Sequence, residues 1–291
     1  MFINKNTFKL LRLPFSFFLM PLFLLALSQS VVPAFSKTLF SFIIIHFFIY
    51  PASNGYNSYV DRDENSIGGL EKPPLPTRRL FYVTILLDVL AVALAALFVN
   101  YLFSLCLLIY IAASRAYSSR QVRLKQYPYT GFLVVVFFQG AFTYFTAMTG
   151  IAEGQLSLNS PTLFIFLACS FQIAGAYPLT QVYQYQQDLK DGVVTLSYQL
   201  GYKGTFVFTA TMFLICNLFY YLYFNSIDRL FNFYILQMFF LPIIIFFIYW
   251  FYKVNSNVSH ANFKNAMRMN WISSACMNSC FIILYLLNHY Y

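Results

Sequence analysis

Charged residues are scarce in this chain, and their scarcity determines its class. Only 9% of the 291 residues are Asp, Glu, Lys or Arg, whereas 60% are hydrophobic and 21% are aromatic. A soluble domain of this length needs many more charged side chains to cover its surface. The composition therefore excludes a soluble globule and indicates an integral membrane protein.

Histidines and paired cysteines are also few. The chain has three histidines and five cysteines, it contains no CxxC motif, and all the cysteines fall within apolar segments. The spacing of Cys276 and Cys280 is more typical of small-residue helix packing than of a metal-ligand pair. The cysteines therefore indicate neither a metal centre nor a redox compartment.

Long apolar runs, in contrast, are abundant. A membrane-spanning helix needs about 20 apolar residues, and most of the runs approach that length. We predict nine spans, at residues 14–33, 37–56, 80–99, 101–114, 129–149, 161–182, 204–225, 230–252 and 270–288. The first is interpreted as a retained anchor rather than a cleaved signal. The fold class is thus an all-α membrane protein, with nine transmembrane helices in a single bundle and one domain over residues 1–291.

The basic residues set the expected orientation, because Lys and Arg accumulate in short cytoplasmic loops. With the N-terminus cytoplasmic, 16 of the 18 basic residues fall on the inner side, and only Lys37 and Arg229 fall outside. We expect a multi-pass protein of the cytoplasmic (inner or plasma) membrane with its active site facing the cytoplasm. Topology also explains the net charge of +9, so no nucleic-acid partner is expected.

One short phrase occurs twice in the sequence. Residues 50–57 read YPASNGYN and residues 177–184 read YPLTQVYQ, and each phrase is followed four residues later by an acid, Asp61 or Asp188. Both copies follow an inward-going predicted span. The chain is therefore predicted to contain an internal parallel repeat, with spans 1–4 matching spans 5–8.

Polar residues after the second and sixth spans recur at helical spacing, so each set is expected to share one helix face. The two stripes consist of Asn57, Asp61 and Asn65, and of Gln184, Asp188 and Asp191. Pro51 and Pro178 stand at the same offset before them, where paired kinks would tilt both stripes toward a common centre. Carboxylate and amide oxygens suit Mg²⁺, which also takes phosphate oxygens. The stripes therefore predict a metal site for a polyanionic ligand.

Several motifs at matching spacing carry a family resemblance. They are Asn57-x3-Asp61-Arg62-Asp63, Lys72-Pro73-Pro74-Leu75, and Gln184-x3-Asp188-x2-Asp191-Gly192-x2-Thr195-Leu196-x3-Leu200-Gly201. In combination they resemble the UbiA superfamily of intramembrane prenyltransferases over the whole chain. Two positions depart from the family pattern, which has an acid where this chain has Asn65 and another where it has Gln184. The pattern also has a Tyr four residues before the basic-loop Lys, where Gln121 stands here, and Tyr117 is out of register.

The resemblance implies an enzyme that transfers an isoprenyl group from an isoprenyl diphosphate to an aromatic or lipid-like acceptor within the bilayer, with Mg²⁺ as cofactor. The implied catalytic residues are Asp61, Asp188 and Lys125. The implied diphosphate-binding residues are Asn57, Arg62, Arg123, Lys125 and Gln184. The implied metal ligands are Asn57, Asp61, Asn65, Gln184, Asp188 and Asp191.

Other assignments stay open at this point. A cation-coupled membrane transporter also has repeats and kinked polar helices, and a catalytically weakened member of the prenyltransferase family would have lost carboxylates from its motifs. Tyr56 and Tyr183 are candidates for an electron-rich wall around an allylic cation. Asp88 within span three is either functional or paired with the nearby Arg78 and Arg79.

Overall fold

The computed structural model describes residues 4–152 and 159–290, and this part of the chain is built from helices. Within it, nine helical segments are long and apolar enough to cross a membrane. These spans are Lys5–Gln29, Phe35–Asp61, Arg78–Phe98, Tyr101–Ser118, Pro128–Ile151, Ser160–Leu179, Leu196–Ser226, Leu230–Ser256 and Phe263–Tyr290. The prediction of an all-helical protein with nine spans is confirmed.

The described residues form fourteen α-helices, with short 3₁₀ and π segments between some of them, and all but α11 belong to the spans. In chain order these are α1 (Lys5–Leu10), α2 (Ser16–Leu19), α3 (Pro21–Gln29), α4 (Phe35–Ile43), α5 (Tyr50–Asp61), α6 (Arg78–Phe98), α7 (Tyr101–Ser118), α8 (Pro128–Gln139), α9 (Ala141–Ile151), α10 (Ser160–Leu179), α11 (Tyr185–Lys190), α12 (Leu196–Ser226), α13 (Leu230–Ser256) and α14 (Phe263–Tyr290).

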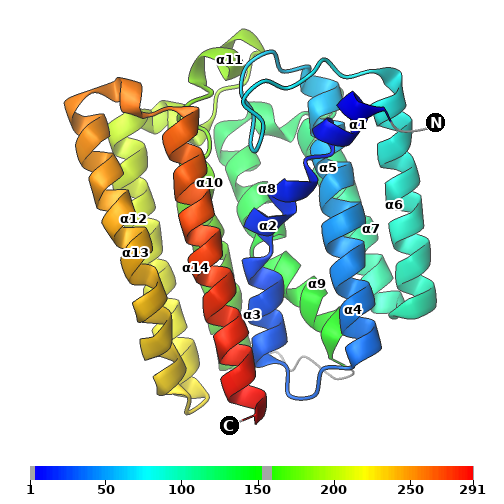
Figure 1. Cartoon of the computed structure of the whole chain (residues 1–291), viewed down its shortest axis with the longest axis vertical. Helices are drawn as coiled ribbons and strands as arrows, with labels where there is room; N and C mark the ends of the chain where they lie inside the picture. Colours follow the sequence, from blue (N-terminus) through cyan, green and yellow to red (C-terminus); the bar gives the residue numbers. More distant parts are fainter. Residues whose placement is uncertain (1–3, 153–158, 291) are drawn as a thin grey trace.

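The helices run side by side in one bundle (Figure 1), and their contacts close it into a ring. Each span packs against the next along the chain, and α14 of the last span packs against α3 of the first. The chain ends lie at opposite ends of the bundle, and α11 caps the end at which the chain begins. Loops that follow α5 and α10 therefore meet at that same end, although which end faces the cytoplasm remains a prediction from the basic residues.

The first span differs from its prediction. It begins at Lys5 rather than at residue 14, and it is broken twice, at Arg12 and at Met20. Arg12 adopts the left-handed conformation, with φ of 50°. Since the span starts earlier than hydropathy indicated, Arg12 lies inside the bundle rather than ahead of it. The fourth span is longer than predicted and continues to Ser118.

Pro51 and Pro178 do not act as a matched pair of kinks. Pro51 stands in the first turn of α5, directly after the π-helix Ile44–Ile49, and this wider hydrogen-bonding pattern accommodates the missing N–H. Pro178 stands one residue before the end of α10, and the chain then turns before α11 begins at Tyr185. The residues after span six are therefore not a continuation of its helix.

The fifth span is interrupted at Gly140, which separates α8 from α9. A Cβ on Gly140 would lie 2.3 Å from the Val136 carbonyl oxygen and 2.6 Å from Ser170 Cα, so only glycine fits here. The Ala141 amide freed by the break donates to Ser170 Oγ at 3.2 Å. The break thus brings α10 into close contact with the middle of span five.

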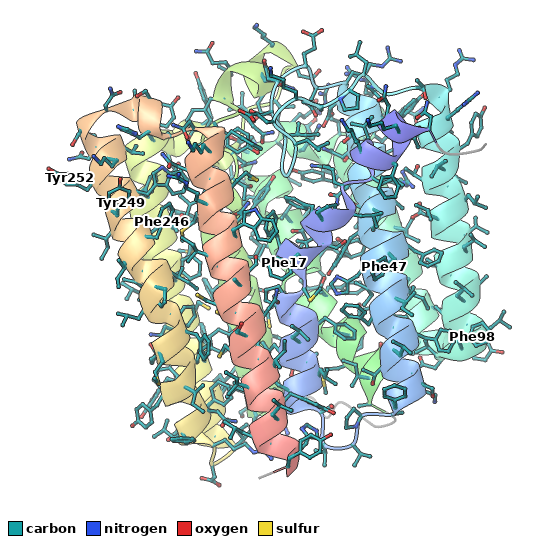
Figure 2. All side chains as sticks on the ribbon, viewed as in Figure 1. Phe17, Phe47, Phe98, Phe246, Tyr249 and Tyr252 are labelled. Carbon is teal, nitrogen blue, oxygen red and sulfur yellow. The ribbon has the colours of Figure 1, made fainter. Side chains whose placement is uncertain are left out.

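Aromatic side chains cover much of the outer surface (Figure 2). Phe47, Phe98, Tyr249 and Tyr252 point away from the bundle, and each is about half exposed or more. In a membrane protein such a surface is solvated by lipid rather than by water. The interior side chains are thus left to form the core and to line a cavity.

Candidate functional site

The bundle encloses a cavity of about 340 Å³ that extends from the end capped by α11 into the apolar interior. Its polar end, called the mouth below, combines acids, amides and basic side chains from several helices and loops. The mouth is lined by Arg12, Asn57, Asp61, Asp63, Lys125, Gln184 and Asp188. Five residues predicted from sequence, Asn57, Asp61, Lys125, Gln184 and Asp188, therefore face one cavity.

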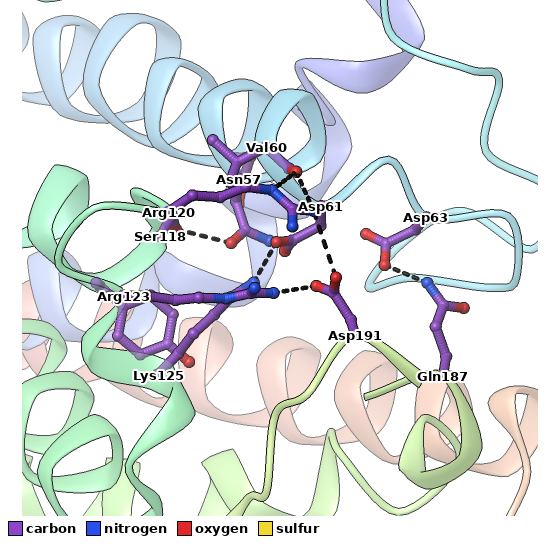
Figure 3. A network of polar contacts seen from close by, with 12 residues as sticks. Asn57, Val60, Asp61, Asp63, Ser118, Arg120, Arg123, Lys125, Gln187 and Asp191 are labelled. Atoms are coloured by element: carbon purple, nitrogen blue, oxygen red, sulfur yellow. Dashed lines mark hydrogen bonds and ion pairs between the residues drawn. The ribbon is translucent and has the colours of Figure 1, made fainter. Parts of the chain in front are cut away.

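The first motif occupies the last turns of α5 (Figure 3). Asp61 ends the helix, and its side chain, 8% exposed, forms an ion pair with Lys125, which is 10% exposed. One turn earlier, Asn57 Oδ1 accepts a hydrogen bond of 2.8 Å from Ser118 Oγ. Lys125 reaches the mouth from the loop between α7 and α8. The motif and the basic loop are thus joined by direct contacts.

The second motif lies on α11. Gln184 occupies the N-cap position, and its Nε2 donates to the Ser66 carbonyl at 3.3 Å. The Asp188 carboxylate lines the mouth and has no hydrogen bond or ion pair with any other described residue. Burial raises the pKa of Asp188 to about 7, with the charges of Asp63 and Asp61 adding to the effect and Lys125 opposing it.

Asp63 is the third carboxylate at the mouth. Burial and the neighbouring charge of Asp61 raise its pKa to about 6, although Lys125 and Arg12 oppose the shift. Like charges held close together in a low-dielectric site disfavour ionisation. The mouth therefore holds more negative charge than its basic side chains compensate, which is an environment suited to a cation.

Four predicted site residues lie outside the cavity lining: Arg62, Asn65, Arg123 and Asp191. Arg62 ends α5 in the left-handed conformation and is exposed. Asn65 lies in the following loop, so the predicted stripe over Asn57, Asp61 and Asn65 on one helix is wrong at its third member. Helix α5 cannot extend to it because the chain reverses at Arg62.

Asp191 and Arg123 contact each other rather than the cavity. Asp191 is the C-cap of α11 and forms an ion pair with Arg123 and a longer one, of 3.3 Å, with Arg120. Arg120 also donates to the Val60 carbonyl at 3.1 Å. These contacts tie the basic loop to both motifs around the rim of the mouth (Figure 3).

Gln187 was not identified from the sequence, yet it links the two motifs. Its Oε1 accepts a hydrogen bond of 3.2 Å from the backbone N–H of Asn65, and its Nε2 donates to Asp63. Gln187 faces the loop after α5 because the chain turns between α10 and α11. In a continuous helix the same residue would point in another direction. No local sequence signal distinguishes Gln187 from its neighbour Gln186.

Arg12 was assigned to the topology signal, and the structure places it in the mouth instead. It is 8% exposed, and its guanidinium donates to the carbonyls of Gly68 at 3.2 Å and Asn54 at 3.1 Å. Its Nε has no hydrogen-bond partner among the described residues. Three of the four described non-glycine residues with positive φ are Arg12, Arg62 and Arg123. Such backbone conformations are concentrated at functional sites.

Tyr56 does not line the cavity. Its ring lies under the Arg115 guanidinium, 3.9 Å from the ring centroid, and Arg115 forms an ion pair with Asp88. The partner of Asp88 is therefore Arg115 rather than Arg78 or Arg79. Tyr183, in contrast, lines the cavity, and its role beside an allylic cation stays a prediction.

Two further tyrosines lie below the mouth. The Tyr117 and Tyr177 hydroxyls hydrogen-bond to each other across the cavity wall, and Gln181 Nε2 donates to the Tyr177 hydroxyl at 2.9 Å. Tyr117 is out of register in the sequence motif, yet the end of α7 delivers it to the cavity. These hydroxyls mark the boundary between the polar mouth and the apolar interior.

The donor set fits a divalent cation bound together with a phosphorylated ligand. Among residues 4–152 and 159–290, no three His, Cys, Asp or Glu side chains are close enough to form a complete metal centre. Mg²⁺ does not require one, because it is usually held by one or two carboxylates plus phosphate oxygens and water. Asp188 and Asp63 line the cavity with raised pKa values, and no described cationic side chain forms an ion pair with either.

Comparison with known proteins agrees with this geometry. The model of the UbiA prenyltransferase family matches residues 16–273. A UbiA homolog from Archaeoglobus fulgidus solved bound to GPP and Mg²⁺ is 18% identical, with a TM-score of 0.70 over 97% of this chain and 99% of that one. The same homolog bound to DMAPP and Mg²⁺ gives the same identity, TM-score and coverage.

A structure described for digeranylgeranylglyceryl phosphate synthase in membranes is also similar, at 17% identity, with a TM-score of 0.59 and 97% of each chain covered. No protein among the curated sequences matches. At these identities the structural similarity shows the fold, while the family model extends over most of the chain.

Proposed function

Because the chain belongs to the UbiA prenyltransferase family, we propose that it transfers an isoprenyl group from an isoprenyl diphosphate to an aromatic or lipid-like acceptor, in a Mg²⁺-dependent reaction. One observation carries the proposal: Asp61 and Asp63 from one motif and Asp188 from the other line the same cavity mouth. The structures of the archaeal homolog with GPP or DMAPP and Mg²⁺ support the assignment of the ligand class.

In this proposal the carboxylates of Asp61, Asp63 and Asp188 would hold the metal. The side-chain amide oxygens of Asn57 and Gln184 would be further ligands beside them. Bound Mg²⁺ supplies positive charge that stabilises the departing diphosphate. The family pattern has acids at the positions of Asn65 and Gln184, and Asp63 supplies a carboxylate in their place. Gln187 orients it through the hydrogen bond from its Nε2.

Basic side chains around the mouth bind the diphosphate. Lys125 and Arg12 line the cavity directly, whereas Arg123 and Arg62 stand at the rim. Charge that develops on a leaving group is stabilised most by donors that are already in place and shielded from water. Lys125 meets this requirement because it is almost fully buried and is held by Asp61.

The cavity interior suits the isoprenyl cation left after the diphosphate departs. Its walls below the mouth include the rings of Tyr117, Tyr177, Phe138 and Phe213. Aromatic faces stabilise a neighbouring cation, and a closed bundle limits access of water to it.

Orientation in the membrane completes the proposal. The mouth faces the cytoplasm if the basic residues follow the positive-inside tendency, and the two motifs derive from a parallel repeat of spans 1–4 and 5–8. A cation-coupled transporter is expected to hold its ionisable residues near mid-bilayer. In this chain the acids of the cavity lie at its mouth instead.

The test is binding and turnover of geranyl diphosphate by the purified protein in detergent, with and without Mg²⁺. We expect Mg²⁺-dependent binding and diphosphate release in the wild type and loss of both in Asp188→Asn. Asp228→Asn is the matched control, because Asp228 lies in the loop at the opposite end of the bundle. Equal Mg²⁺-dependent binding in Asp188→Asn and the wild type would show that the proposal is wrong.

A weakened family member is the second candidate, since amides stand at two positions where the family has acids and no complete set of acidic ligands comes together in the described residues. Gln184→Asp restores one carboxylate at the mouth. If the wild type binds geranyl diphosphate without releasing diphosphate, and Gln184→Asp releases it, the weakened assignment is correct. Release by the wild type itself excludes it.

A further inference from the structure

Polar side chains also line the deep end of the cavity, away from the mouth. Gln139 from α8 and Gln172 from α10 both line it, together with Tyr110 from α7. Gln172 lies seven residues before the end of α10 at Leu179, which corresponds to about 10 Å along the helix axis. Two amides at this depth in an apolar bundle require an explanation, because polar groups there are costly unless they are hydrogen-bonded.

Gln172 has one free donor. Its side chain accepts a hydrogen bond of 2.6 Å from the Tyr220 hydroxyl through Oε1, and the residue is only 9% exposed. Its Nε2 has no hydrogen-bond partner among the described residues. Since the same residue lines the cavity, the free N–H groups are available to a ligand inside it.

Gln139 is placed beside it by the break in span five. It is the last residue of α8, directly before Gly140, and it lines the cavity together with Tyr110. A broken helix at membrane depth is tolerated where it is buried in protein or lines a cavity, and in transporters such breaks form ligand sites. The close approach of Ser170 to Gly140 holds this break against α10, the helix that carries Gln172.

The chemistry around the two amides is neutral. Among the described lining residues the only basic ones are Arg12 and Lys125, both at the mouth. The walls around them combine apolar side chains, for example Phe240, Ile243 and Met277, with the neutral polar side chains of α14, which are Asn270, Ser273 and Ser274. A carboxylate or a phosphate would find no counter-charge among the described residues there, whereas a neutral oxygen on an apolar ring would find a hydrogen-bond donor and uncharged walls.

We infer that Gln172, assisted by Gln139, binds a neutral oxygen of the acceptor, either the carbonyl or the phenolic hydroxyl of an aromatic or quinone-like ring. The inference rests on the proposed prenyl transfer and names the acceptor class for it. Gln172 lies five residues below Tyr177 on α10, or about 7.5 Å along the axis. A ring held by its oxygen at Gln172 therefore extends toward the base of the mouth, where the isoprenyl carbon is released.

The same amide disfavours the isoprenoid tail at this spot. A hydrocarbon chain packed against the Gln172 Nε2 leaves a buried donor unpaired, which costs far more than a lost contact. Tail and acceptor are thus directed to different parts of the cavity. Replacing the amide by an apolar side chain of similar length is expected to remove this preference for the acceptor over the tail.

The experiment compares two neutral probes of similar shape, 1,4-naphthoquinone with two carbonyls and naphthalene with none, by equilibrium dialysis against purified protein in detergent. Gln172→Met is expected to weaken naphthoquinone binding about fivefold, the equivalent of about one hydrogen bond, and to leave naphthalene binding unchanged. Gln237→Met is the matched control, because Gln237 pairs with Asn217 between α12 and α13 and does not line the cavity. Each affinity is expressed as the ratio of the variant value to the wild-type value, so that partition of the probe into the micelle cancels.

Two results would overturn the inference: unchanged naphthoquinone affinity in Gln172→Met, or equal loss for both probes. Tighter binding of long-chain isoprenyl diphosphates by Gln172→Met would also overturn it, because the tail would then occupy the deep end. Mg²⁺-dependent binding of geranyl diphosphate is measured in the same preparations and also reports on folding. If that binding is absent in the wild type while the probes still discriminate, the proposed function fails and the neutral-oxygen site stands.

Discussion

The ion pair between Lys125 and Asp61 provides the sharpest test of the mouth. We predict that Lys125→Met lowers the free energy of unfolding of the metal-free protein by about 4 kcal/mol. Both side chains are about nine-tenths buried. Two unit charges about 4 Å apart attract by about 4 kcal/mol at an effective dielectric constant of about 20, and breaking a buried pair from one side costs about 3–5 kcal/mol.

The double variant separates this pair from a general packing effect. Asp61→Asn with Lys125→Met removes both charges and leaves neither unpaired, so it is expected to cost less than the sum of the single variants by about 2 kcal/mol. The free energies are measured by reversible unfolding in mixed micelles, with helicity as the signal. Lys253→Met, at the end of α13, is the control for the loss of a lysine.

Metal dependence adds a second readout to the same series. Mg²⁺ at the mouth replaces the counter-charge that Lys125 provided, so it is expected to restore part of the stability lost in Lys125→Met but not the turnover. Loss of one electrostatic donor from an active site typically lowers kcat by about 100- to 1,000-fold. Strictly additive free energies in the double variant, with no restoration by Mg²⁺, would refute this account of the mouth.

Three further predictions concern neighbouring features. Mg²⁺-dependent binding of geranyl diphosphate strengthens from pH 6 to pH 8, because burial raises the pKa of Asp188 to about 7 and the metal requires the ionised form. The stability of the metal-free protein changes with pH in the opposite direction. Folded Asp188 keeps a proton that the unfolded chain loses above a pKa of 3.8, so the melting temperature falls as the pH rises from 4 to 7. Gln187→Leu removes a hydrogen bond to the charged Asp63 and raises the Mg²⁺ concentration needed for half-maximal binding about tenfold; an unchanged requirement contradicts its role. Gly140→Ala forces a Cβ against backbone atoms of Val136 and Ser170 and destabilises the protein by about 3 kcal/mol, and a melting temperature equal to the wild type contradicts the packing argument.

Much of the mouth could be predicted from sequence because its residues are close together along the chain. Asn57 and Asp61 are one helical turn apart, and α5 presents both to the cavity as that spacing requires. The prediction is wrong for Asn65 because the chain changes direction at Arg62, and residue spacing alone does not reveal such a turn. Gln184 and Asp188 were placed at the mouth correctly, although α11 carries them instead of an extension of α10.

Contacts between distant segments could not be predicted. Arg12 was separated from the site by a misplaced start of the first span, and only the closed ring brings it beside Asn54 and Gly68. Asp88 was expected to pair with Arg78 or Arg79, which are near in sequence, but the packing of α6 against α7 offers Arg115. Proximity along the chain is a poor guide where neighbouring helices supply the partner.

The sequence by itself determined the class of the protein, the number of its spans and the motifs that face one another, because hydropathy, helical period and spacing act locally. Tertiary structure alone decided which cations meet which acids at the mouth, and it placed Gln139 and Gln172 together at the deep end. The physical reason is that an ion pair or a shared cavity depends on how helices close into a ring. That closure is the summed result of packing over the whole bundle, and no single segment encodes it.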